Sequence, residues 1–422
     1  MTPFRVPRGM TRRHFVSHLA GMSALSIPAM AFAKSLQANA ETLKRNHKSC
    51  ILLWMSGGPP TIDIWDLKSG APTGGPSTPI ATGGDFQISD KLPLLAPQMK
   101  HVSLVRSMST READHARGRY YMHTGYVPNP NIEHPSYGAV VAHEMEDKIS
   151  GLEIPPFVSI GGASEGPGFL GMAYAPFQVD SNGRIRDLRF EGKEQRLADR
   201  LVLLEAVEKR FINERRGMAA VDHARVLEKT KALLTSDQMK AFNAMSEPEP
   251  VRERYGNSGF GRGCMLARRL VEAGVPFVEV DFGGWDLHQN CFTSLETKLP
   301  EMDKAMSALI EDLQQRGLLE DTVVLWMGEF GRTPRINGNA GRDHYARAWS
   351  VAVGGCGIKP GIAVGETNAD GTQVTTEPYT SEDLMATVCQ ALGISLQTVF
   401  TSNNGRPMKI ANGGKVIREL FA

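Results

Sequence analysis

Charged and imidazole side chains crowd into the segment TVVLWMGEFGRTPRINGNAGRDHY, residues 322–345 of this 422-residue chain. An apolar run stops at Gly328, and a loop rich in Gly and Pro follows. Four side chains in this loop can bind a metal or an anion: Glu329, Arg332, Asp343 and His344. Carboxylate and imidazole are common ligands of transition metals, and guanidinium pairs with oxyanions. The segment therefore predicts a site for a metal, an anion or both.

A second polar segment, GGWDLH, follows the apolar residues 277–282. Asp286 and His288 are alternate residues, so in extended chain they point the same way and can share one ion. Oxygen plus imidazole ligands suit zinc, manganese or iron. The alternative is an ordinary surface Asp and His. The same alternative holds for Asp343-His344, because adjacent residues seldom ligate one ion unless the backbone bends.

Glu329 comes two residues after the end of the largely apolar run 322–327, so its carboxylate is expected close to a buried strand. A carboxylate there needs a partner, because burying an unpaired charge is costly. The partner is either a metal ion or Arg332. In the second interpretation a Glu329–Arg332 ion pair simply holds the loop.

Ser109 and Thr110 are candidate nucleophiles. Each follows the apolar run 101–108, with His115 five or six residues further on. A hydroxyl at a strand end can attack phosphorus or sulfur when a metal lowers its pKa. The alternative is a helix cap, since Ser109-Thr110-Arg111-Glu112 also fits capping chemistry. Both interpretations stand at this point.

The elements that would position these residues alternate between strands and helices. Apolar runs predict strands at 49–55, 101–108, 277–282, 322–327 and 349–353. Helical patterns cover 137–146, 262–273, 294–317 and 381–392, the last starting with an approximate capping box at Ser381. Continuous apolar strands between helices predict an α/β fold with a mostly parallel sheet and helices on both faces. In such a sheet the loops after parallel strands share one edge, so distant residues meet.

A helical block interrupts this alternation at residues 192–246, where apolar residues keep a helical period. We interpret it as a helical insertion at about 190–260. The rest of the composition is ordinary for a globular chain, with 41% hydrophobic and 22% charged residues. The formal net charge of +1 gives no electrostatic reason to expect nucleic acid or an anionic membrane as a partner. Five scattered cysteines predict no disulfide framework.

The first 33 residues have the order of a twin-arginine signal peptide: Arg12-Arg13, a weakly apolar run, and an Ala31-Phe32-Ala33 cleavage site. We therefore expect residues 1–33 to be removed after recognition by the twin-arginine (Tat) export machinery. The mature domain would be residues 34–422, periplasmic or secreted. No later run reaches the roughly 18 apolar residues of a membrane helix, so no stable membrane span is expected.

Several motifs together resemble the domain of unknown function 1501 family over about residues 48–421. They are LLWMSGGPPTIDIWDLK, HARGRYYMHTGY, GRGCMLARRLVEAGVPFVEVDFGGWDLH, LEDTVVLWMGEFGRTPRINGNAGRDHY and GGCGIKPGIAVGETNADG. That family is related to the alkaline phosphatase and sulfatase superfamily. The resemblance implies an alkaline phosphatase-like three-layer α/β fold.

The resemblance also implies roles for single residues. Asp286, His288, Glu329 and His344 occupy positions of metal ligands, and Ser109 or Thr110, with His115, resembles the nucleophile segment. Phe330 stands where the superfamily has a His, and the first-strand Asp is missing, with Asp63 as a substitute from further on. A divalent metal is implied as cofactor, with zinc, manganese or calcium as the candidates.

These expectations combine into one function and one alternative. The leading function is an exported metal-dependent hydrolase of phosphate or sulfate esters, acting on a small-molecule or glycan ester. A metal held by Asp286, His288, Glu329 and His344, with Asp343 or Asp63 as further candidates, would activate Thr110 or Ser109. Arg332 would steady the ester oxygens. The alternative is a non-catalytic periplasmic binding or scaffold protein that keeps the fold with a degenerate site.

Overall fold

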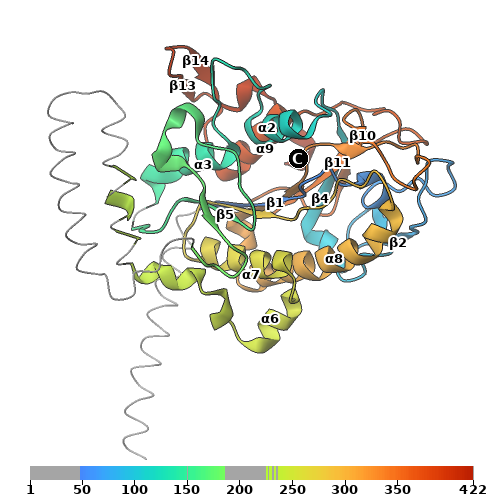
Figure 1. Ribbon diagram of the computed structural model, residues 1–422, viewed down its shortest axis with the longest axis horizontal. Coiled ribbons are helices and arrows are strands. Elements are labelled where there is room, and N and C mark those ends of the chain that lie inside the picture. Colours follow the sequence, from blue (N-terminus) through green and yellow to red (C-terminus); the bar gives the residue numbers. More distant parts are fainter. Residues whose placement is uncertain are drawn as a thin grey trace, which may run out of the picture. The chain divides into compact units, whose positions relative to one another are not determined.

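An eight-stranded sheet forms the centre of the fold in the order β12-β4-β11-β8-β1-β7-β5-β6 (Figure 1). The strands are β1 (Ser49–Trp54), β4 (Val102–Met108), β5 (Phe157–Ile160), β6 (Phe177–Val179), β7 (Phe277–Asp281), β8 (Thr322–Met327), β11 (Trp349–Gly354) and β12 (Ala363–Val364). The computed structural model describes residues 48–149, 151–185, 225–226, 228–230, 232–233 and 236–421. The expected twin-arginine signal lies outside these ranges, and so do residues 190–224 of the expected insertion.

The direction of the strands decides which loops can meet. β1 pairs in parallel with β7 and β8, and β7 pairs in parallel with β5. β11 is antiparallel to both β8 and β4, so β4 runs in the same direction as β8. The carboxyl ends of β1, β4, β7 and β8 therefore share one edge, together with the beginning of β11. The predicted α/β fold with a mostly parallel sheet is confirmed.

Helices cover both faces of the sheet (Figure 1). α7 (Gly259–Glu272) and α8 (Cys291–Gln315) lie on one face, and α2 (His115–Thr124), α3 (Tyr137–Met145) and α9 (Ser381–Leu392) lie on the other. Side chains of β1 alternate between the two resulting cores, with Ile51 and Leu53 packed on the α7–α8 side and Cys50 and Leu52 on the other. Burial on both faces explains why the strands read as continuous apolar runs.

Smaller elements complete the described part. α6 (Glu249–Tyr255) packs near α7 and α8. Three two-stranded ribbons pair β2 (Pro79–Ala81) with β3 (Gln87–Ser89), β9 (Gly331–Arg332) with β10 (His344–Tyr345), and β13 (Val399–Thr401) with β14 (Pro407–Lys409). No helix in the described ranges is long and apolar enough to cross a membrane.

Two helix ends correct the sequence interpretation. α2 begins at His115, and the side chain of Asp114 accepts a hydrogen bond from the backbone N–H of Arg117. The reading of Ser109-Thr110 as a helix cap is therefore wrong. At α9 the capping box consists of Thr380 and Asp383, one residue earlier than predicted. At the other end of α2, Gly125 terminates the helix with a left-handed φ of 74°.

Candidate metal centre

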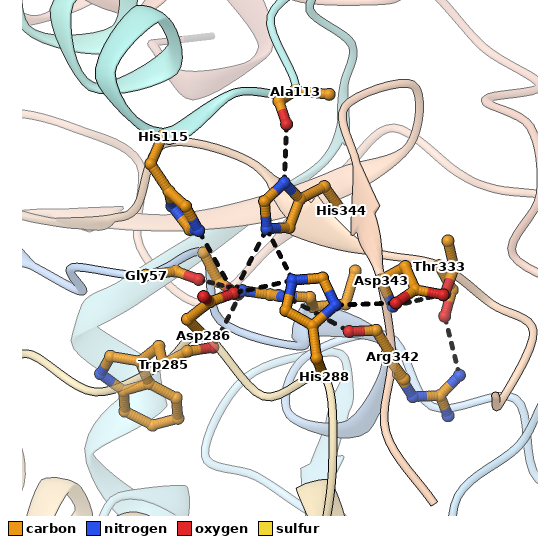
Figure 2. Close-up of polar contacts among 12 residues, drawn as sticks. Gly57, Ala113, His115, Trp285, Asp286, His288, Thr333, Arg342, Asp343 and His344 are labelled. Atoms are coloured by element: carbon orange, nitrogen blue, oxygen red, sulfur yellow. Dashed lines mark hydrogen bonds and ion pairs between the residues drawn. The ribbon is translucent and has the colours of Figure 1, made fainter. Parts of the chain in front are cut away.

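Three imidazoles converge on one carboxylate oxygen at the shared edge of the sheet (Figure 2). The Nε2 atoms of His115, His288 and His344 lie 3.2, 3.1 and 3.2 Å from Oδ1 of Asp286. His115, Asp286 and His344 each offer one possible ligand atom, and these three atoms all lie within 4.8 Å of one another. This spacing can hold a metal ion. The Asp286 side chain is about half exposed, so the cluster is open to solvent.

Each residue reaches the cluster because its element ends at this edge. His115 begins α2, which follows β4, while Asp286 and His288 follow β7. His344 lies on β10, just before β11. Because β11 is antiparallel to its neighbours, its first residues lie at the edge where the other strands end. The one reversed strand is thus what brings His344 to the site.

A second layer of oxygens holds the other nitrogen of each ring. His115 Nδ1 lies 2.7 Å from Oε1 of Glu329, and His288 Nδ1 lies 2.7 Å from Oδ1 of Asp343. His344 Nδ1 donates to the carbonyl of Ala113 over 2.7 Å. An imidazole whose Nδ1 donates to an oxygen has its lone pair on Nε2 when neutral. Such outer oxygens fix tautomer and orientation in histidine metal sites.

The inner atoms of the cluster fit a cation. His288 Nε2 and His344 Nε2 are 3.0 Å apart, so two neutral rings would face each other lone pair to lone pair. A proton on one ring or a metal ion between them removes this repulsion. His115 Nε2 is buried and has no hydrogen-bond partner among the described residues, since its approach to Asp286 has the distance but not the angles of a hydrogen bond. Ligand atoms around tetrahedral zinc lie about 3.3 Å apart for bonds of about 2.0 Å, close to the spacing here.

The ionisation of the cluster also suits ligation. Burial opposes the charge of Asp286, but the hydrogen bond and the positive charge of Arg332 outweigh it and hold the pKa of the carboxyl well below its ordinary value. Burial lowers the pKa of His344, which favours the neutral ring. The hydrogen bond to Glu329 raises the pKa of His115, and the hydrogen bond from His288 lowers the pKa of Asp343. Asp286 and His344 are therefore in the forms that bind metal at neutral pH.

Arg332 is buried at 0% side-chain exposure, and its guanidinium is used within the protein. Nη2 donates to Asp286 Oδ1 over 2.6 Å and to the carbonyl of Gly57, and Nε donates to the carbonyl of Gly58 over 2.7 Å. Nη1 donates to the carbonyl of Arg342 over 3.1 Å. This residue compensates the charge of Asp286 and holds the loop after β1, instead of facing a ligand.

Glu329 supports His115 and does not pair with Arg332. Its Oε1 accepts a 2.8 Å hydrogen bond from the backbone N–H of Gly57, and the side chain is nearly fully buried. Its Oε2 is buried, and no described residue offers it a hydrogen bond. Because Arg332 pairs with Asp286, the interpretation of the loop as a Glu329–Arg332 ion pair is wrong.

Asp63 lies away from the converging atoms, in a buried ion pair. Its two oxygens accept hydrogen bonds of 2.7 and 2.8 Å from Nε and Nη2 of Arg342. Arg342 also donates to the carbonyls of Thr333 and Pro334. Asp63 is thus not among the residues that the structure brings together. It anchors the loop on which Asp343 and His344 lie.

The two candidate nucleophiles lie at the carboxyl end of β4, in the same segment as His115. The Thr110 side chain is buried, and its hydroxyl lies 3.4 Å from the carbonyl of Ala346. Ser109 is half-buried, and its backbone N–H donates to Tyr379. Within the described contacts, neither hydroxyl has a hydrogen bond to the histidine cluster.

Sequence reasoning did not foresee His115 as a ligand or the Ala113 carbonyl as a support for His344. His115 was predicted only to act beside a nucleophile. The available signal was the Asp114-His115 pair directly after a strand, a position from which a side chain reaches the sheet edge. The ring of Phe330, which the family resemblance led us to expect in place of a His, lies 5.2 Å from the ring of His115 and 4.6 Å from that of His344.

The fold and the site define an α/β protein with a histidine–carboxylate cluster at the carboxyl edge of its sheet. The chain belongs to the family described as "Protein of unknown function (DUF1501)", whose model matches residues 47–421. This confirms the family expected from the sequence. No curated protein matches the sequence.

Solved structures show distant similarity over most of the chain. A sulfatase from Pseudoalteromonas sp. is 12% identical with a TM-score of 0.41, covering 86% of this chain and 70% of its own. A protein in the alkaline phosphatase superfamily from Vibrio parahaemolyticus is 12% identical with a TM-score of 0.39, covering 88% and 69%. An alkaline phosphatase from an Antarctic bacterium is 14% identical with a TM-score of 0.38, covering 82% and 99%.

Proposed function

We propose that this chain is a metal-dependent hydrolase of phosphate or sulfate esters. The observation that supports it is the convergence of three Nε2 atoms and one carboxylate oxygen, with each ring held from behind by an oxygen acceptor. Three imidazoles and one carboxylate suit zinc, and also manganese or iron. A divalent cation at such a centre supplies Lewis-acid polarisation of an ester oxygen.

Each residue has a proposed role. Asp286, His288, His344 and His115 would hold the metal. Glu329, Asp343 and the Ala113 carbonyl would orient the three rings. Arg332 would keep Asp286 ionised, which replaces its expected role on the ester oxygens because its nitrogens already donate to the protein.

Thr110 or Ser109 remains the proposed nucleophile, since both follow β4 at the edge where the cluster lies. For attack, the Thr110 hydroxyl has to turn away from the carbonyl of Ala346. Ser109 is half-exposed and has no such constraint. The variants Ser109→Ala and Thr110→Ala separate the two, because only loss of the nucleophile abolishes hydrolysis with the metal still bound.

The test combines metal analysis with an ester panel. We expect the purified protein to bind close to one equivalent of zinc or manganese, and to hydrolyse a phosphate or sulfate ester of the panel. Asp286→Ala should abolish both, and Asp237→Ala, at an exposed site outside the cluster, should change neither. Absence of bound metal after incubation with zinc, manganese and iron would contradict the proposal.

The alternative is a binding protein that keeps the centre without catalysis. The buried Thr110 hydroxyl, directed at Ala346, favours it. Metal binding together with silence across phosphate monoesters, phosphate diesters and sulfate esters would support this alternative over the hydrolase.

We also propose export by the twin-arginine route, on the basis of Arg12-Arg13 and the following cleavage motif. Replacing both arginines by lysine in the full chain should leave the protein in the cytoplasm, as measured by cell fractionation. A periplasmic or secreted product that persists in this variant would contradict the route.

A further inference from the structure

Glu279 is a buried carboxylate in the middle of β7, with 1% of its surface exposed. His123 Nε2 lies 3.2 Å from its Oε1, and the Ser164 hydroxyl donates to its Oε2. Arg119 Nη2 lies 3.9 Å from Oε1. A charge in the centre of a sheet is costly to bury and persists only when it is paired in this way. None of these groups belongs to the proposed metal centre.

The partners of Glu279 lie on the same helix as His115. His115, Arg119 and His123 follow one another at intervals of four residues, so they share one face of α2. Arg119 Nε pairs with Glu165 over 3.1 Å. Its guanidinium lies 5.5 Å from the ring of Trp54, and the His123 ring lies 4.1 Å from the same indole. Two successive turns of α2 are thus held to the sheet through charge.

The strand that carries Glu279 also leads into the metal centre. β7 ends at Asp281, and the loop that follows it carries Asp286 and His288. The helix held by Glu279 carries His115 on its first turn. Glu279 therefore joins the two elements whose relative position sets the 3.2 Å separation of His115 Nε2 from Asp286 Oδ1.

Glu279 is ionised in this setting. Burial by itself disfavours the charge, but His123, Arg119 and Ser164 together hold the pKa of the carboxyl below its ordinary value. His123 Nδ1 lies 2.9 Å from the carbonyl of Arg119, so the ring is held between its own helix and Glu279. The carboxylate thus joins the strand to the helix through His123 and Arg119.

We infer that Glu279 is a positioning residue for the metal centre: through His123 and Arg119 it fixes α2 on β7 and thereby places His115 beside Asp286. This inference rests on the proposed function only in that the cluster binds a metal. It requires no particular substrate. The residue acts through another side chain, so its loss should change the geometry of His115 more than it changes the fold.

The experiment compares Glu279→Gln with Asp312→Asn. Asp312 is an equally buried carboxylate, paired with Arg254 and Arg268 in contacts of α8 with α6 and α7, on the other face of the sheet. Both variants lose one buried charge, so both should have a lower Tm. Only Glu279→Gln should shift the ring resonances of His115 in NMR spectra of the metal-free protein. It should also weaken zinc affinity by about 10- to 100-fold, the size typical of outer-layer residues.

A double-mutant cycle shows whether the effect passes through His115. In a His115→Ala background, Glu279→Gln should weaken zinc affinity no further. If Glu279→Gln does not fold, His123→Asn provides the same comparison with the carboxylate retained. Unchanged His115 resonances in the folded variant, or equal changes in Asp312→Asn, would overturn the inference. If Glu279→Gln shifts the His115 resonances but the protein hydrolyses no ester, only the proposed hydrolase function is contradicted. The inference about Glu279 then stands.

Discussion

The setting of Asp281 contrasts with that of Asp286, because its pKa is raised and that of Asp286 is lowered. Asp281 lies at the end of β7 and makes no hydrogen bond or ion pair among the described residues. Burial, opposed by Arg119 but reinforced by Glu279 and Glu329, raises its pKa to about 6. A raised carboxyl pKa means that the folded state binds the proton more tightly than the unfolded state. The contribution of the protonated Asp281 carboxyl to the free energy of unfolding is therefore fully present below pH 3.8. It is lost as the pH rises from 3.8 to about 6.

We therefore expect Asp281→Asn to become more stable relative to the wild type as the pH rises from 4 to 7. The full shift corresponds to about 3 kcal/mol, and partial exposure to water reduces the expected gain to about 1–2 kcal/mol. Urea unfolding at both pH values measures it. Asp370→Asn, at an exposed loop position, controls for the loss of one carboxylate. A gain that is the same at both pH values would contradict the assignment.

At the residue scale, the sequence predicted which residues converge better than it predicted the contacts that each of them makes. Asp286, His288 and His344 were expected to share a site because strand ends meet at one edge, and the structure brings them together. The roles of Asp63 and Arg332 could not be foreseen, because they depend on which buried oxygens each guanidinium reaches. That choice follows from packing across segments more than 200 residues apart, which no local pattern encodes.

At the scale of elements, the loop after β1 has to pass very close to the loop after β7. Gly57 has a φ of 116°, and a Cβ added there would lie 2.5 Å from the backbone nitrogen of Asp286. Only glycine tolerates this combination of dihedral and contact. The same loop donates its Gly57 N–H to Glu329, so it connects two supports of the cluster.

We expect Gly57→Ala to displace Asp286 and to lose both metal binding and several kcal/mol of stability, since backbone atoms have to move apart. Gly70→Ala is the matched control, because Gly70 also has a positive φ of 82° but no atom within 4 Å of an added Cβ. It should cost only about 1 kcal/mol, from the dihedral alone. Urea unfolding and metal content compare the two, and equal losses would contradict the role of the close contact.

The element order followed well from the sequence because the strands are buried on both faces and read as apolar runs. The predicted strands at 49–55 and 322–327 correspond to β1 and β8 within one residue. The direction of β11 was not predicted, since an apolar run of six residues looks alike in either orientation. This direction decides that His344 reaches the site.

At the scale of the whole molecule, metal binding should stabilise the folded state, because the ligands come from segments that separate on unfolding. With zinc at about 100 times its dissociation constant, the expected gain is about 2.7 kcal/mol. Thermal unfolding with and without zinc measures this as a rise in Tm. The rise should vanish in His344→Ala and persist in His143→Ala, a histidine on α3 outside the cluster. A rise in both variants would indicate binding elsewhere.

The central place of β1 in the sheet has a consequence for the timing of assembly. Its neighbours β7 and β8 begin more than 200 residues later in the chain, so the middle of the sheet forms only by long-range pairing. His344 follows both of them. A nascent chain that has not yet reached His344 therefore lacks part of the histidine–carboxylate cluster. The proposed metal centre therefore cannot be complete before residue 344 has been synthesised.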